Sequence, residues 1–177
     1  VYRGASELLE KKDFFSTLKA KWFYLAPLSG KLSNLTGEII SCAKKNKAKI
    51  AANFGNSQIK SNQKEIKSWL SGIDILILNQ EEASLLTGIN YRFEEKIIEK
   101  LNLLHSGINI MTKGEQGVTV TVHNKIYQAK TRPFKVIDET GAGDAFGSGF
   151  VSALMRNKKI DDCIRFGLVN SKYALKE

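Results

Sequence analysis

The sequence has 177 residues, of which 42% are hydrophobic and 25% are charged, and its formal net charge is +9. This length allows one domain with a hydrophobic core and is too short for two, so we predict a single domain over residues 1–177. A basic protein can attract nucleic acid, an anionic membrane or a phosphorylated ligand. The lysines are spread along the chain and do not cluster with aromatic residues. They therefore indicate a solvated surface, and we predict no nucleic-acid or membrane partner.

Short apolar runs alternate with longer amphipathic segments along the chain. The runs that we predict as strands cover residues 22–26, 49–52, 74–78 and 108–112. The helical patterns cover residues 35–45, 64–70, 81–86 and 93–105. Continuous apolar runs are typical of strands covered on both faces, as in a parallel sheet. The alternation therefore predicts an α/β fold with right-handed crossovers between strands.

Residues 117–123 break this rhythm, because valines and threonines alternate there as they do in a half-buried strand. A turn at His123-Asn124 and a second strand over residues 125–130 predict a hairpin attached to the mostly parallel sheet. A short apolar run at 134–137 and a glycine-rich turn follow. We predict a helix over about 143–155 and a last helix that starts near 160–162 and runs to the chain end.

The segment Asp138-Glu139-Thr140-Gly141-Ala142-Gly143-Asp144-Ala145-Phe146-Gly147 is a turn of small residues that opens into a helix. Small residues let backbone N–H groups approach an anion, and the first helical turn favours a phosphate there. Asp144, in this first turn, can accept a proton from an attacking hydroxyl, so the segment fits phosphoryl transfer. On the residues alone, a structural turn with a helix-end charge remains the alternative. No Gly-Lys-Ser/Thr follows, which excludes a P-loop.

The string Asp138-x-Thr140-Gly141-Ala142-Gly143-Asp144-Ala145-Phe146, followed by Gly149-Phe150, resembles the C-terminal signature of the ribokinase/PfkB family of carbohydrate kinases. The resemblance implies a ribokinase-like three-layer α/β/α fold. It also implies that the Gly141, Ala142 and Gly143 amides form the anion hole for the γ-phosphate of ATP and that Asp144 is the catalytic base. Asp138 would help to hold a monovalent cation such as K⁺. Glu139 departs from the family, which usually has a threonine or another small residue there.

Two further segments and the single residue Asn170 match the same family in the same order. Asn79-Gln80-Glu81-Glu82 resembles its Asn-x-x-Glu motif, which implies that Asn79 and Glu82 govern Mg²⁺ and phosphate through water. Helix capping is the alternative for these two residues. Thr112-Lys113-Gly114-Glu115-Gln116-Gly117 resembles the Thr-x-Gly-x-x-Gly turn, which implies nucleotide binding by Thr112, Gly114 and Gly117. The resemblance places Asn170 beside the adenine, and it leaves the role of Asn53 open because the family's proline is missing after it.

The isolated residue types indicate no other chemistry. Cys42 and Cys163 lie in apolar-periodic segments, which predicts buried free thiols in a reducing compartment. His105 is interpreted as helix surface and His123 as the hairpin turn, and neither has a metal-ligand spacing. No membrane-length apolar run or signal-peptide pattern occurs, so the cytoplasm is the predicted location.

The predicted function is phosphorylation of a sugar hydroxyl by ATP with Mg²⁺, with a nucleoside or sugar phosphate as possible acceptors within the family. The alternative is a non-catalytic nucleotide-binding fragment or a degenerate relative. The chain starts at Val1 and ends in a helical pattern without a stop signal, so we expect the C-terminal part of a kinase, truncated at both ends. The family's sugar-gripping residues belong to the N-terminal half, and a homodimer is compatible with the full-length protein.

Overall fold

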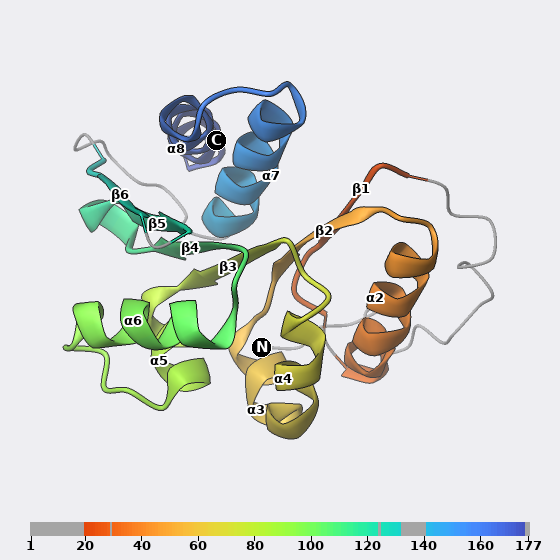
Figure 1. Ribbon diagram of the computed structural model, residues 1–177. Helices are drawn as coiled ribbons and strands as arrows, with labels where there is room; N and C mark the ends of the chain where they lie inside the picture. The colour runs from red at the N-terminus through yellow and green to blue at the C-terminus, as the bar shows by residue number, and fades with distance from the viewer. Residues whose placement is uncertain (1–19, 29, 124, 132–140, 176–177) are drawn as a thin grey trace.

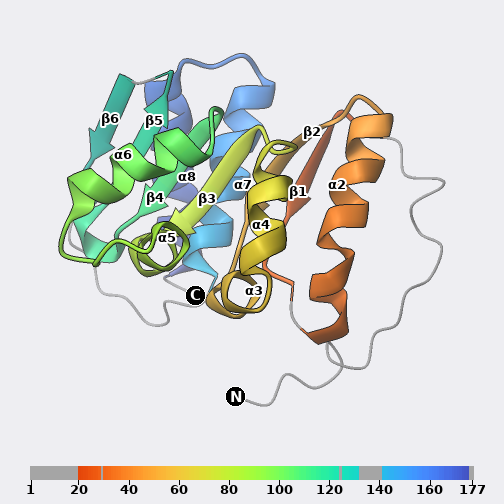
Figure 2. The same ribbon diagram turned by 60° about the horizontal axis from the view of Figure 1, so that its bottom comes forward.

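The computed structural model describes residues 20–28, 30–123, 125–131 and 141–175. These ranges hold a six-stranded sheet in the order β1-β2-β3-β4-β5-β6 (Figure 2). The strands are β1 (Trp22–Leu25), β2 (Lys49–Asn53), β3 (Ile75–Asn79), β4 (Ile108–Thr112), β5 (Val118–Val122) and β6 (Lys125–Ala129). The first four strands are parallel, whereas β5 and β6 pair antiparallel as a hairpin. The predicted mostly parallel sheet with an attached hairpin is therefore confirmed.

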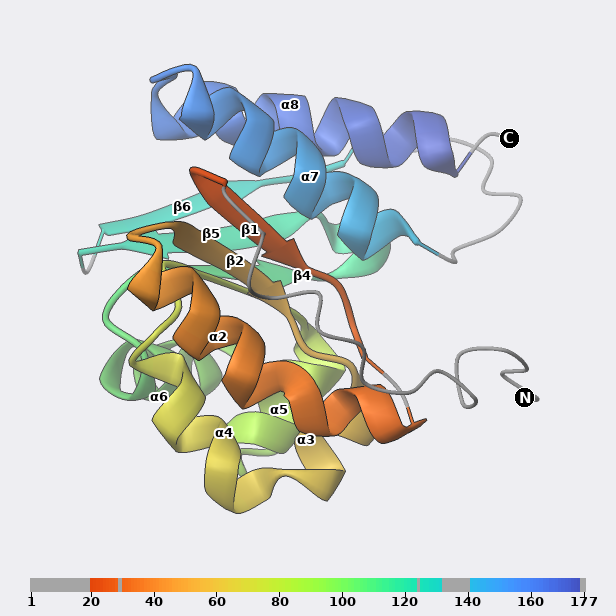
Figure 3. The ribbon, with the colours of Figure 1, turned by 90° about the vertical axis from the view of Figure 1, so that its right-hand side faces the viewer.

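Helices cover both faces of the sheet, which gives the predicted three layers (Figures 1 and 3). One face carries α2 (Thr36–Lys45), α3 (Asn56–Ser61), α4 (Gln63–Leu70), α5 (Gln80–Thr87) and α6 (Glu94–Leu104). The other carries α7 (Ala142–Met155) and α8 (Ile160–Ala174). Two 3₁₀ turns, η1 (Gly30–Leu35) and η2 (Gly114–Gln116), complete the described elements. Within the described ranges no helix is long and apolar enough to span a bilayer.

The run Ile75-Leu76-Ile77-Leu78 in β3 shows why the central strands are continuously apolar. Ile75 and Ile77 belong to the core cluster under α7 and α8, whereas Leu76 and Leu78 belong to the cluster under α2 to α6. All four side chains are at most 1% exposed. Burying one such side chain stabilises a fold by roughly 1.5–3 kcal/mol as an upper estimate, so this strand ties both helical layers to the sheet.

The two helices on the second face approach each other closely at two glycines. A Cβ at Gly149 would lie 2.9 Å from the carbonyl oxygen of Phe166 and 3.2 Å from the Cα of Gly167. A Cβ at Gly167 would lie 2.8 Å from the Phe146 ring. These contacts leave no room for larger residues, so we call the Gly149–Gly167 contact the glycine seam between α7 and α8.

The structure corrects two interpretations of the sequence and adds one helix. His105 is only 3% exposed, because its ring nitrogens lie 2.7 Å from Asn109 Oδ1 and 3.0 Å from the carbonyl oxygen of Ile73; it is not on the surface. Cys42 is half-buried, whereas Cys163 is buried as predicted. Helix α3 was not predicted. The apolar run at 134–137 and most of the glycine-rich turn lie outside the described residues.

Candidate active site

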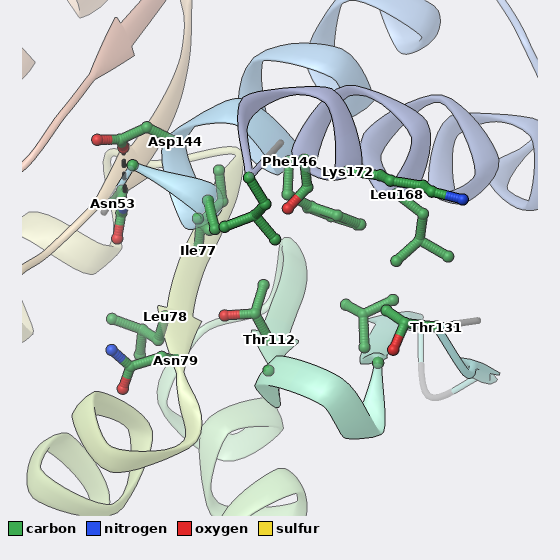
Figure 4. Close-up of a pocket in the computed structure, with 18 of the residues that line it drawn as sticks. Asn53, Ile77, Leu78, Asn79, Thr112, Thr131, Asp144, Phe146, Leu168 and Lys172 are labelled. Carbon is green, nitrogen blue, oxygen red and sulfur yellow. Dashed lines mark hydrogen bonds between the residues drawn. The ribbon is translucent and has the colours of Figure 1, made fainter. Parts of the chain in front are cut away.

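A cavity of about 580 Å³ opens where the carboxyl ends of the parallel strands meet the start of α7 (Figure 4). Asn53, Asn79 and Thr112 end β2, β3 and β4, and all three line this cavity. Parallel strands bring their carboxyl ends to one edge of the sheet, which is where ligands bind in open α/β folds. Segments that are far apart in the sequence therefore contribute to one concave site.

The N-terminus of α7 forms one wall of the cavity through Gly141, Ala142, Gly143 and Asp144. Gly141 precedes the helix with φ 80°, a left-handed conformation that glycine adopts without a steric penalty. The first helical hydrogen bond runs from Ala145 N to the carbonyl oxygen of Gly141 at 2.8 Å. By helix geometry, the N–H groups before it lie outside the helical ladder and carry partial positive charge. This wall can therefore receive an anion.

Asp144 is held by two side chains from neighbouring strands. Asn53 Nδ2 donates to Asp144 Oδ1 at 2.8 Å (Figure 4). The Tyr24 hydroxyl lies 3.2 Å from the same carboxylate oxygen and 3.4 Å from the Asp144 backbone oxygen. Burial, followed by the charge of Asp144 and the hydrogen bond to it, raises the pKa of Tyr24 far above its ordinary value. The phenol therefore stays protonated and remains a donor.

Asn79 and Glu82 form a capping box at the start of α5. Asn79 Oδ1 accepts from Glu82 N at 2.8 Å, and Glu82 Oε2 accepts from Asn79 N at 2.7 Å. Both residues also line the cavity, so capping and a ligand role are compatible here. Burial raises the pKa of the Glu82 carboxyl above its ordinary value; the hydrogen bond from Asn79 N opposes this, and the charges of Glu81 and Asp144 add to it.

The turn after β4 brings Thr112, Gly114 and Gly117 to the opposite wall of the cavity. Gly117 has φ 97° and ψ −133°, outside the region that other residues occupy readily. Lys113, inside the turn, forms a 2.7 Å ion pair with Glu94 of α6. This ion pair anchors the turn to the helical layer behind the sheet.

Most residues predicted for the site lie around this one cavity. The predicted positions that line it are Gly141, Ala142, Gly143, Asp144, Thr112, Gly114, Gly117, Asn79 and Glu82. Asn170 is not among the described lining residues, because its side chain faces α7 and its Nδ2 lies 2.7 Å from the carbonyl oxygen of Ala145. Asp138 lies outside the described residues. No sequence pattern pointed to Tyr24, and Asn53 was noted without a role.

The end of the cavity away from Asp144 was also not foreseen. Leu168 and Lys172 from α8 and Thr131 after β6 line it (Figure 4). Only Asn170 drew attention to α8 in the sequence. Helical periodicity instead turns Leu168 and Lys172 of α8 toward the cavity, and Leu175 directly after the helix also lines it.

The model of the pfkB family of carbohydrate kinases matches residues 1–176. The ribokinase of Haemophilus influenzae is 38% identical over 144 residues, which cover 80% of this chain and 44% of that protein. The solved structure of Arabidopsis thaliana ribokinase with ribose and ATP has a TM-score of 0.75 at 23% identity, over 89% of this chain and 50% of that one. Schistosoma mansoni adenosine kinase with 2-fluoroadenosine has a TM-score of 0.75 at 20% identity, over 89% of this chain and 51% of that one.

The fold is therefore that of the ribokinase-like sugar and nucleoside kinases, with a cavity at the carboxyl edge of the sheet. The chain belongs to the PfkB family of carbohydrate kinases. It spans about half the length of the relatives that it matches.

Proposed function

We propose that the protein containing this chain transfers the γ-phosphate of ATP to a hydroxyl group of a sugar. Asp144 would accept the proton of that hydroxyl as general base. The amides of Gly141, Ala142 and Gly143 would form the anion hole for the transferring phosphoryl group. Family membership supports a kinase reaction on a sugar or a sugar-containing acceptor.

The observation that carries the proposal is the position of Asp144 at the anion-receiving end of α7, inside the cavity. A helix-end charge with no ligand role would need no concave site beside it. Packing also does not require glycine at 143, since a Cβ there would lie 3.8 Å from Asn53 Nδ2, an ordinary contact. A bare backbone at this position is instead useful to a ligand that must approach the amides closely.

Asn79 and Glu82 are proposed to hold Mg²⁺ through water. Glu82 offers a carboxylate at the cavity wall, and its Oε1 is not used by the capping box. Within the described ranges no three acidic, cysteine or histidine side chains form a metal cage. Mg²⁺ commonly keeps several waters and binds through one or two carboxylates together with substrate phosphates, so this donor set fits it. The bound ion would neutralise charge on the phosphates.

The proposed nucleotide contacts follow the cavity from Asp144 toward its α8 end. Thr112, Gly114 and Gly117 would contact the nucleotide, and its nucleoside part would lie toward Leu168 and Lys172. Because the amide of Asn170 faces α7, this residue would affect the adenine only indirectly, by holding α8 in place. Asp138 keeps its proposed role at a K⁺ site.

The proposed setting of the enzyme is that of a small-molecule kinase. We assign it to the cytoplasm, and we expect ATP and a small sugar as its ligands, with no nucleic-acid or membrane partner. A homodimer of the full-length protein is the assembly to be tested.

The test compares the complete polypeptide that contains this chain with its Asp144→Asn variant. The substituted amide keeps an oxygen that can accept from Asn53 and Tyr24, so the change removes the base and leaves the local contacts in place. Calorimetry with Mg²⁺-ATP measures binding, and a phosphorylation assay over a panel of sugars and nucleosides measures turnover. We expect turnover to fall by roughly 10²–10⁴-fold with ATP affinity nearly unchanged.

The outcomes separate the proposal from its alternative. Equal turnover by both proteins would remove Asp144 from the chemistry. Nucleotide binding by both without any turnover would favour the non-catalytic nucleotide-binding alternative. Absence of nucleotide binding by a folded protein would refute the anion hole.

A further inference from the structure

The Tyr24 hydroxyl contacts Asp144 from the outer parallel strand of the described sheet. Its oxygen lies 3.2 Å from Asp144 Oδ1 and 3.4 Å from the Asp144 backbone oxygen. A phenol has one proton, so this proton is shared between two acceptors of the same residue. Because one acceptor belongs to the side chain and the other to the backbone, the contact restricts rotation of the carboxylate relative to α7.

Asn53 donates to the same carboxylate oxygen at 2.8 Å. Two donors from adjacent strands therefore meet on Oδ1, since β1 and β2 are paired in parallel. A carboxylate oxygen with two fixed donors is a poor proton acceptor for a third group. Both donors from the described part of the chain are on Oδ1, so Oδ2 is the oxygen available to a substrate hydroxyl.

The room for the Tyr24 hydroxyl depends on a glycine in α7. A Cβ at Gly147 would lie 2.4 Å from the Tyr24 hydroxyl oxygen and 2.9 Å from its ring. Gly147 lies one helical turn after Asp144, on the side of α7 that faces the sheet. The helix therefore keeps a gap beside the base, and the tyrosine fills it.

We propose that Tyr24 is a positioning residue for the catalytic base: it fixes Asp144 through Oδ1 so that Oδ2 faces the acceptor hydroxyl. This inference rests on the proposed kinase function. Burial raises the pKa of the Tyr24 phenol, with smaller contributions from the charge of Asp144 and the hydrogen bond to it, so the hydroxyl remains a donor across the working pH range. The 3.2 Å contact is longer than the usual distance between two hydroxyl-type oxygens, so its contribution is smaller than that of a short charge-assisted bond.

The test is Tyr24→Phe in the complete polypeptide, with Tyr127→Phe as matched control. Tyr127 in β6 packs against the same core cluster and does not line the cavity, so its substitution removes a phenol hydroxyl away from the base. We expect Tyr24→Phe to lower kcat about tenfold, equal to about 1.4 kcal/mol of activation free energy. The KM values for ATP and acceptor stay within about twofold, because a base-positioning contact acts on the chemical step. The control keeps the wild-type kcat.

A double-mutant cycle excludes a merely structural effect. If Tyr24 acts through Asp144, Tyr24→Phe has no further effect on the residual turnover of the Asp144→Asn protein. An equal tenfold loss in both backgrounds, or an unchanged kcat in the single variant, would overturn the positioning role. If Asp144→Asn retains full turnover, the proposed function fails first and the inference fails with it. If Asp144→Asn is impaired while Tyr24→Phe is not, only the inference fails.

Discussion

Gly117 gives the sharpest stability test, because two independent obstacles oppose any side chain there. Its φ of 97° and ψ of −133° lie outside the left-handed helical region, and this type of strain is worth about 1–3 kcal/mol. A Cβ would also lie 1.9 Å from the carbonyl oxygen of Ala129, whereas real Cβ contacts are essentially never shorter than 3.0 Å. That oxygen belongs to the end of β6, which pairs with Val118 in the hairpin. Overpacking of this kind adds about 1–3 kcal/mol.

Gly114, in the same turn, is the matched control. It also has a positive φ of 56°, but no atom lies within 4 Å of its hypothetical Cβ. Gly114→Ala therefore introduces only left-handed strain of about 1–2 kcal/mol. Gly117→Ala is expected to lower the free energy of unfolding by about 2–6 kcal/mol, from both effects together.

Urea denaturation followed by circular dichroism measures this difference, with equal m-values as the sign that only stability has changed. Because Gly117 lines the cavity, calorimetry should also show at least tenfold weaker Mg²⁺-ATP binding for Gly117→Ala. Equal loss of stability in the two variants would refute the clash with Ala129 as the reason for glycine.

Two further substitutions separate structural from ligand roles. Glu82→Gln keeps an oxygen for the capping box, so we expect unchanged or slightly higher stability at neutral pH. Its Mg²⁺-dependent ATP binding should be weaker, because the carboxylate is lost. Glu82→Ala also removes the capping contact, which should lower the free energy of unfolding by about 0.5–2 kcal/mol. Because the folded pKa of Glu82 is raised above its ordinary 4.5, its contribution to stability is complete below that value and is lost as pH rises through the folded pKa. The melting temperature of the wild type should therefore fall relative to that of Glu82→Gln as pH rises above 4.5. Asn170→Ala removes the contacts to Ala145 and Ser148, so chemical denaturation should show that the free energy of unfolding falls by about 1 kcal/mol. A large loss of ATP affinity with unchanged stability would instead indicate that Asn170 contacts the adenine directly.

The layered fold could be predicted because its strands are buried on both faces. The run at 75–78 has no polar position, which is typical of a short strand that is covered on both faces. Helix α3 was missed for the opposite reason. It has six residues, of which Ile59 is the hydrophobic one, so no apolar period could develop. Its buried Gln58 instead donates to Thr36 Oγ1 at 2.8 Å, and no local sequence pattern predicts this contact.

The site could be predicted where its residues form continuous strings. The small residues around Gly143 and the Asn79–Glu82 spacing are visible because helix ends impose short-range rules. The partners of Asp144 could not be found in this way, since Tyr24 and Asp144 are 120 positions apart. The burial of His105 was equally hidden, because its contact to Ile73 joins the residue after α6 to the segment before β3.

The glycine seam also has a mechanical consequence for the site. The close approach of the two helices at Gly149 and Gly167 leaves α7 and α8 little room to slide along each other. The anion-receiving end of α7 and the Lys172 end of the cavity thus belong to one rigid helix pair that packs on the sheet. Any closure of the cavity on this side would therefore displace both ends together, so the proposed phosphate contacts and the proposed nucleoside contacts would change in a single movement.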